Sequence, residues 1–98
     1  MKFVHISVHF EYTAFVEATL DRHEVQDYVR YPMMEGKDQD GKHFGSQVFP
    51  GNVTVFQALV KEENLDPLFD ELERFRRSKP AHEHLQAVVL PVERCLRG

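Results

Sequence analysis

The alternation of apolar and polar residues is clearest at the start of the chain. Between residues 3 and 10 every second side chain is apolar, and one face then carries Val4, Ile6, Val8 and Phe10. A period of two predicts a β-strand with that face on a core. From Glu11 to His23 the spacing becomes helical, because Tyr12, Phe15, Val16, Thr19, Leu20 and His23 share one stripe. We therefore expect a strand followed directly by a helix.

Three later segments have the composition of strands. Residues 28–34 are rich in Tyr and Val but contain Pro32, which predicts an edge strand because proline cannot donate to a ladder. Residues 53–60, VTVFQALV, are apolar on both faces, as expected for a central strand. Residues 85–92, LQAVVLPV, predict the last strand.

A second helix is expected between the last two strands. Asp66-Pro67 has the pattern of a helix start, with Asp as the cap and Pro at the first helical position, and Pro80 ends the helix. Its apolar stripe contains Leu68, Phe69, Leu72 and Phe75. Acidic residues early and basic residues late complement the helix dipole.

This order of elements predicts one α+β domain over residues 1–98. It is a ferredoxin-like βαββαβ sandwich, a four-stranded antiparallel sheet with both helices on one face and a long loop between the second and third strands. The second sheet face then exposes apolar residues, among them Val53, Val55, Leu59, Val88 and Leu90. Such a face predicts that copies of the chain associate through their sheets.

The loop over residues 33–52, MMEGKDQDGKHFGSQVFPGN, holds four of the five glycines and has no regular period. Connections of this length are usually functional or disordered. Its G-x-x-x-x-G-K run has His43 where a P-loop needs a hydroxyl. Its calcium-like Asp38-x-Asp40 pair lacks the acidic ligand, because Gln47 stands at that position. For residues 37–42 we therefore expect a flexible polar turn.

Composition narrows the setting of the protein. The net charge is −4, which gives no general attraction to nucleic acid. The N-terminal run lacks the length and the cleavage site typical of a signal peptide, and no apolar run approaches ~20 residues, so we expect no membrane insertion. A single cysteine, Cys95, fits a reduced, cytoplasmic location.

The element order, the long loop and the run HFGSQVFPGN over residues 43–52 resemble the PII-like family. This family contains the nitrogen regulatory protein PII and the CutA type. The resemblance implies a homotrimer, with ligands such as adenine nucleotides, small anions or metal ions in the clefts between subunits. It also implies that the loop over residues 36–51 reports ligand occupancy to a partner protein. A glycine-rich segment precedes the last strand of nucleotide-binding members, whereas residues 78–86 here read SKPAHEHLQ.

The candidate site residues fall into three groups. The ligand-binding candidates are Gly36, Gly45, Ser46 and Gln47 from the loop and Arg76, Arg77, Lys79 and Arg94 from the basic cluster. Arginine binds phosphate or carboxylate through its planar fork. The alternative is that the basic residues only complement the helix dipole at its C-terminal end, which requires no ligand. The metal candidates are His43, His82 and His84, the last two on one side of an extended segment, as for Zn²⁺ or Cu²⁺. An ordinary solvated role for His82 and His84 is the alternative interpretation.

Three functions remain open from the sequence. The first is a PII-like sensor that is not an enzyme, and the second is a CutA-like protein that binds divalent metals. The third is a small ferredoxin-like enzyme with His9 or Tyr28 as its base. No catalytic triad supports this third function. His5 and His9 lie ~13 Å apart on the non-core face of the first strand, too far to share one metal within a subunit. We expect them to form hydrogen bonds at a subunit interface.

Overall fold

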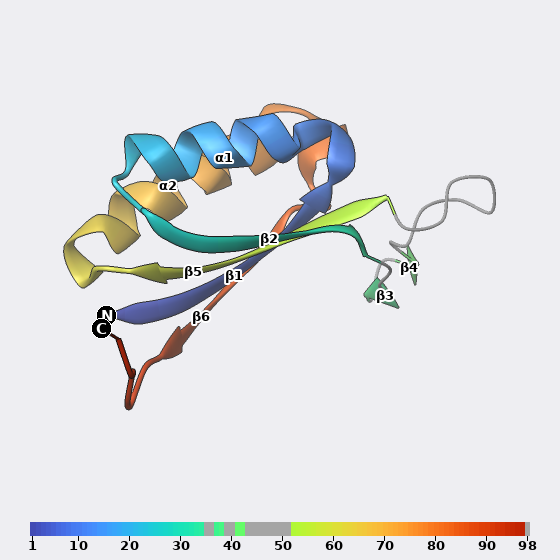
Figure 1. Cartoon of the computed structure of the whole chain (residues 1–98). Coiled ribbons are helices and arrows are strands. Elements are labelled where there is room, and N and C mark those ends of the chain that lie inside the picture. Colours follow the sequence, from blue (N-terminus) through green and yellow to red (C-terminus); the bar gives the residue numbers. More distant parts are fainter. Residues whose placement is uncertain (35–36, 39–40, 43–51, 98) are drawn as a thin grey trace.

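A computed structural model of the chain describes residues 1–34, 37–38, 41–42 and 52–97. It confirms the ferredoxin-like α+β sandwich, with both helices on one face of a four-stranded antiparallel sheet (Figure 1). The elements are β1 (Lys2–His9), η1 (Phe10–Tyr12), α1 (Thr13–Arg22), β2 (Asp27–Met34), β5 (Val53–Val60), α2 (Glu62–Ser78), η2 (Pro80–His82) and β6 (Gln86–Pro91). Within the described residues, no helix is long and apolar enough to cross a membrane.

The sheet has the strand order β2-β5-β1-β6, and neighbouring strands are antiparallel. Strand β5 is central, as its two apolar faces predict, and β2 lies at an edge. The register of β2 shifts between Tyr31 and Met34, next to Pro32, and Met33 has a φ of 58°. A bulge and a proline both protect a sheet edge from pairing with other chains.

The core lies between the sheet and the helices. Val4, Ile6 and Val8 of β1 point toward it, as the alternation predicts, and Phe56 of β5 is fully buried there. From the helices, the fully or almost fully buried apolar residues are Val16, Leu20, Leu68 and Leu72. These side chains hold the two layers together through the area that they remove from water.

Phe10 corrects the prediction for the first strand. The strand ends at His9, and Phe10 begins the short helix η1 with 62% of its surface exposed. The side chains of Thr13 and Thr54 form a hydrogen bond of 2.9 Å, which holds the start of α1 against the start of β5. The chain therefore turns away from the sheet one residue before the apolar alternation ends.

Helix α2 begins at Glu62, five residues before Pro67, which was the predicted first helical position. The Asn64 N–H donates to the Lys61 carbonyl over 2.9 Å and so closes the first turn. The early carboxylates of Glu62 and Glu63 favour the positive end of the helix dipole. Pro67 lies inside the helix, where it removes one backbone hydrogen bond. Burial of Leu68 and Leu72 anchors the turns that follow Pro67.

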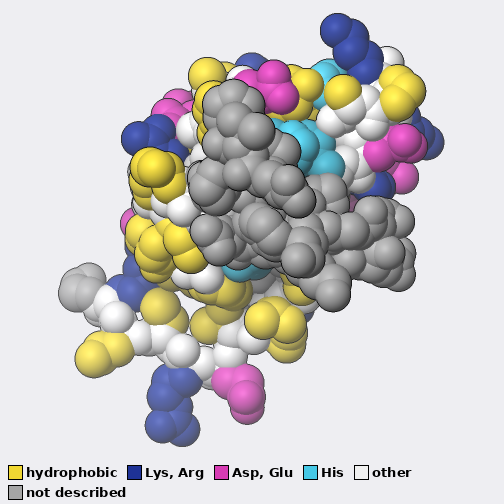
Figure 2. Space-filling model, turned by 90° about the vertical axis from the view of Figure 1, so that its right-hand side faces the viewer, with side chains coloured by type: hydrophobic (Ala, Val, Ile, Leu, Met, Phe, Trp, Pro, Cys, Tyr) yellow, Lys and Arg dark blue, Asp and Glu magenta, His cyan; other side chains and the backbone are white. Residues whose placement is uncertain are grey.

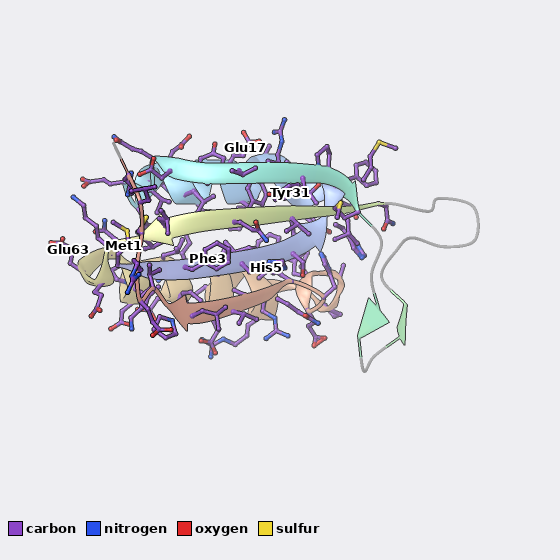
Figure 3. The ribbon with its side chains drawn as sticks, turned by 60° about the horizontal axis from the view of Figure 1, so that its bottom comes forward. Met1, Phe3, His5, Glu17, Tyr31 and Glu63 are labelled. Atoms are coloured by element: carbon purple, nitrogen blue, oxygen red, sulfur yellow. The ribbon has the colours of Figure 1, made fainter. Side chains whose placement is uncertain are left out.

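The sheet face away from the helices is open and largely apolar (Figure 3). Val29, Val88 and Leu90 are each about half exposed on it, at 53%, 51% and 52%. Phe3, His5 and Tyr31 lie on the same face, as the register shows. Val53 departs from the prediction, because only 7% of its surface is exposed. It pairs with both His9 and Met34 on the flanking strands.

Within the expected polar turn over residues 37–42, the described residues form two short paired strands. Strands β3 (Lys37–Asp38) and β4 (Gly41–Lys42) pair as Lys37 with Lys42 and Asp38 with Gly41. The site predictions for Gly36, His43, Gly45, Ser46 and Gln47 fall outside the described residues.

Candidate ligand-binding site at the end of helix α2

A basic hollow lies where α2 ends and the chain turns toward β6. It has a volume of about 430 Å³ and is lined by Arg76, Arg77, Lys79, Pro80 and Glu83. The sequence gathers these cations because the last turn of a helix favours positive charge and Pro80 then ends the helix. The structure thus brings Arg76, Arg77 and Lys79 of the predicted anion site together.

The two arginines of the hollow have different partners. Nη2 of Arg76 donates to the backbone carbonyl of Glu83 over 2.8 Å, which ties the end of α2 to the segment before β6. Arg77 reaches Glu73 only at 3.7 Å, one helical turn away and exposed to water. An arriving anion therefore finds Arg76 bonded to a neutral acceptor and Arg77 in a weak surface pair. Neither contact neutralises the hollow strongly.

The hollow continues into a groove between α2 and the edge strand β6. The groove has a volume of about 530 Å³ and shares Arg76 and Glu83 with the hollow. Its other lining residues are Phe69, Leu72, Glu73, Leu85, Gln86, Ala87 and Val88. Together the two spaces form a cleft with cations at one end and both polar and apolar side chains along its length. This combination suits a small ligand with an anionic group and a body of mixed polarity.

Within one chain, Arg94 lies apart from this hollow. Strand β6 starts opposite Ser7 near the end of α2 and finishes with Pro91 opposite Lys2. Arg94 follows Pro91, so it lies at the far end of the sheet. Arg97 in the same tail pairs with Asp27 at the start of β2. The sequence alone could not show that β6 separates Arg94 from Arg76, Arg77 and Lys79.

His82 is the last residue of the 3₁₀ helix η2, whereas the sequence predicted an extended chain through His82 and His84. His82 is 8% exposed and stacks on Phe75 with ring centroids 3.8 Å apart. Its Nδ1 lies 3.0 Å from the Phe75 carbonyl and 2.9 Å from the Ser78 hydroxyl. These contacts give His82 a structural role, because they fasten the turn to the last residues of α2.

His84 faces the first strand instead. Its ring stacks on that of His9, with centroids 3.7 Å apart, and its Nε2 accepts the His9 backbone N–H over 2.9 Å. Its Nδ1 lies 2.7 Å from the Ala81 carbonyl and therefore carries the proton. Figure 2 shows histidine side chains gathered at this end of the molecule. His82 and His84 thus stack on different rings, Phe75 and His9, while both also contact the ring of Tyr12.

No metal centre is evident in the part of the chain that the structure describes, where no three His, Cys, Asp or Glu residues lie together. His43, the third predicted ligand, is outside this part. Cys95 is exposed in the C-terminal tail.

His5 lies at the middle of the open sheet face, between Gln57 and Val88 on the neighbouring strands. Its Nδ1 is 3.4 Å from the Gln57 amide nitrogen, so the two polar side chains partly satisfy each other.

Glu83 and the pairing of His84 with His9 were not predicted from the sequence. Glu83 acts through its backbone carbonyl, which any residue could supply, so the sequence carries no signal for it. The histidine pair depends on where β6 begins. The last pair of β6 with β1 is Gln86 with Ser7, which leaves the His9 N–H beyond this ladder. A buried N–H needs an acceptor, and the imidazole of His84 supplies one.

The chain returns to the sheet at Asn52, beside this histidine pair. The Phe10 N–H donates to the Asn52 carbonyl over 2.8 Å. The side-chain Oδ1 of Asn52 is buried and has no hydrogen-bond partner among the described residues. An unsatisfied buried acceptor is unusual and costs free energy.

Comparisons with known proteins identify the fold. Neither a family model nor a curated protein matches the sequence. Among solved structures, the chain is similar to CPII, a nitrogen regulatory PII-like protein from Thiomonas intermedia K12 bound to ADP, AMP and bicarbonate. The identity is 23% with a TM-score of 0.69, over 91% of this chain and 86% of that chain. The apo form of CPII matches with a TM-score of 0.61 and 23% identity, over 92% of each chain.

A putative PII-like signalling protein from Thermus thermophilus is also similar. It shares 15% identity and a TM-score of 0.58, over 91% of this chain and 81% of that chain. At these identities the matches establish a shared fold, which agrees with the resemblance seen in the sequence.

Proposed function

We propose that this chain is a PII-like regulatory protein, without catalytic activity, that binds a small anionic ligand in the cleft at the end of α2. The observation that carries the proposal is the basic hollow of Arg76, Arg77 and Lys79, which opens into a groove between α2 and β6 on a PII-like fold. The similar CPII binds ADP, AMP and bicarbonate. We therefore propose an adenine nucleotide or bicarbonate as the class of ligand.

The second part of the proposal is a homotrimer in the cytoplasm. The open sheet face supports the association of subunits. Val29, Val88 and Leu90 each leave about half of their surface exposed on one sheet face, which suits an interface better than an isolated monomer. Three sheets packed around an axis would bury them and would bring neighbouring subunits to the ligand clefts. The segment over residues 36–51 would then report occupancy to a protein partner.

A thermal-shift panel on the purified protein tests this function. We expect ADP, AMP or bicarbonate to raise the unfolding temperature, because a ligand at ~100 times its Kd adds ~2.7 kcal/mol. The double variant Arg76→Gln/Lys79→Gln should lose the shift, whereas Arg94→Gln at the far end of the sheet should keep it. A flat response to every anion would contradict the proposal. A shift with Zn²⁺ or Cu²⁺ alone would favour the CutA-like, metal-binding alternative through His43, His82 and His84.

A further inference from the structure

We propose that His84 couples the basic hollow to the chain at Asn52, so that a ligand in the hollow is sensed where the chain leaves residues 43–51. This inference rests on the proposed function, since it assigns the residue that transmits ligand occupancy. The route consists of three hydrogen bonds between elements that are distant in the sequence. They link Arg76 to Glu83, His84 to His9, and Phe10 to Asn52.

The first link competes directly with a ligand. Arg76 lines the hollow, and its guanidinium is bonded to the Glu83 carbonyl. An anion is a stronger acceptor for a guanidinium than a neutral carbonyl is. An anion that draws Arg76 into the hollow therefore releases the Glu83 carbonyl from α2. Glu83 directly precedes His84, so this release acts on the position of the imidazole.

The second link fixes His84 as a bridge between two backbone groups. Its Nδ1–H donates to the Ala81 carbonyl, while Nε2 accepts the His9 N–H. Both ring nitrogens are thus committed to one tautomer and one orientation. A shift of the η2 turn moves the ring, which then pulls on His9 through the hydrogen bond and the stacked face.

The third link carries the movement to the end of the long loop. Phe10 directly follows His9, and its N–H donates to the carbonyl of Asn52. The buried Oδ1 of Asn52 has no hydrogen-bond partner among the described residues, so a contact is open to it at this point. A rearrangement that pairs Oδ1 with a donor or with water gains that contact. Transmission between sites needs a second arrangement of this kind.

Hydrogen exchange of the Phe10 amide in the full chain tests the coupling without a ligand. Arg76→Met removes the bond to Glu83 but keeps the aliphatic stem. We expect it to speed Phe10 exchange by at least about fivefold, the lower end of typical coupling. Arg77→Met is the matched control, because Arg77 lines the same hollow but contacts Glu73, and it should leave Phe10 unchanged. Exchange of the core Ile6 amide reports whether each variant remains folded.

The effect must pass through the imidazole of His84. His84→Phe keeps a flat ring against His9 but removes the acceptor, so adding Arg76→Met to it should no longer speed Phe10 exchange. His84→Gln retains an acceptor and should restore part of the response. Equal acceleration by Arg76→Met with and without His84→Phe would overturn the coupling, as would no acceleration in the otherwise unchanged protein.

Addition of ADP separates this inference from the proposed function. If ADP stabilises the protein and alters Phe10 exchange only when His84 is present, both stand. If ADP stabilises the protein but leaves Phe10 exchange unchanged, the coupling is wrong and the ligand site stands. If none of ADP, AMP and bicarbonate binds, the proposed function is wrong, and the Arg76→Met comparison still decides the coupling.

Discussion

Glu71 joins the two helices through a cluster of charged and polar side chains. Its carboxylate accepts hydrogen bonds from Arg22 and from His23, the latter at 2.8 Å, and Thr19 lies 3.4 Å away. The Arg22 guanidinium is the main reason that the pKa of Glu71 lies below its ordinary value of 4.5, and His23 lowers the pKa further against the opposing effect of burial. The ionised form of Glu71 is therefore favoured in the folded protein.

Glu71→Gln should lower the free energy of unfolding at pH 7 by about 1 kcal/mol, because two charge-assisted bonds are weakened. The expected loss of unfolding free energy is no larger because the Arg22 side chain is 52% exposed and its contribution is screened by solvent. For a domain of this size the loss corresponds to roughly 4–8 °C in Tm. Urea unfolding of both proteins gives the difference directly.

The difference in unfolding free energy between wild type and Glu71→Gln should become smaller as the pH falls. A carboxyl whose pKa is lowered by folding stabilises the protein above its unfolded-state pKa and loses that contribution as the pH falls through the folded-state value. The gap between wild type and Glu71→Gln should therefore be full above pH 4.5 and close in stronger acid. Glu73→Gln is the control, because its exposed contact to Arg77 spans 3.7 Å. An equal, pH-independent loss in both variants would contradict this role for Glu71.

At the scale of elements, the strands were more predictable than the helix ends. Strand β1 buries one face, and a period of two fixes which of its residues face the core, as Val4, Ile6 and Val8 show. Helix α2 was placed too late because Asp66-Pro67 is a good local start signal. The true start at Glu62 depends on packing of the whole helix against the sheet.

Pro67→Ala should stabilise the protein, because Pro67 lies inside α2 and not at its first position. Alanine restores the N–H that can donate to the Glu63 carbonyl and relieves the clash of the proline ring. The gain should be about 1 kcal/mol, since a more flexible unfolded chain offsets part of it. Denaturant unfolding measures the change. A loss of stability would mean that Pro67 favours the helix as a start signal, as the sequence first indicated.

The candidate site was only partly predictable for a related reason. Arg76, Arg77 and Lys79 are neighbours at one helix end, so local sequence places them together. Arg94 is separated from them by the length of β6, and His84 meets His9 across 75 residues of sequence. Such contacts are set by strand register and by where β6 begins, neither of which a single sequence fixes to the residue.

At the scale of the whole molecule, the two sheet faces differ in what covers them. Helices α1 and α2 cover one face, whereas the other presents Val29, Val88 and Leu90 to solvent (Figure 3). The polar His5–Gln57 contact lies among these apolar side chains. Exposed apolar surface of this kind is characteristic of an interface, here with another copy of the same sheet.

Leu90→Lys should therefore shift the protein toward the monomer without unfolding it. Leu90 is half exposed in the single chain, so lysine is tolerated there, but association would bury its charge without a partner. Leu96→Lys is the matched control, since Leu96 is fully exposed in the tail beyond β6 and should leave the mass unchanged. Light scattering over a range of concentrations measures both. A monomeric wild type, or a Leu90→Lys variant with unchanged mass, would show that this face serves another purpose. The ligand cleft would then have to function within one subunit.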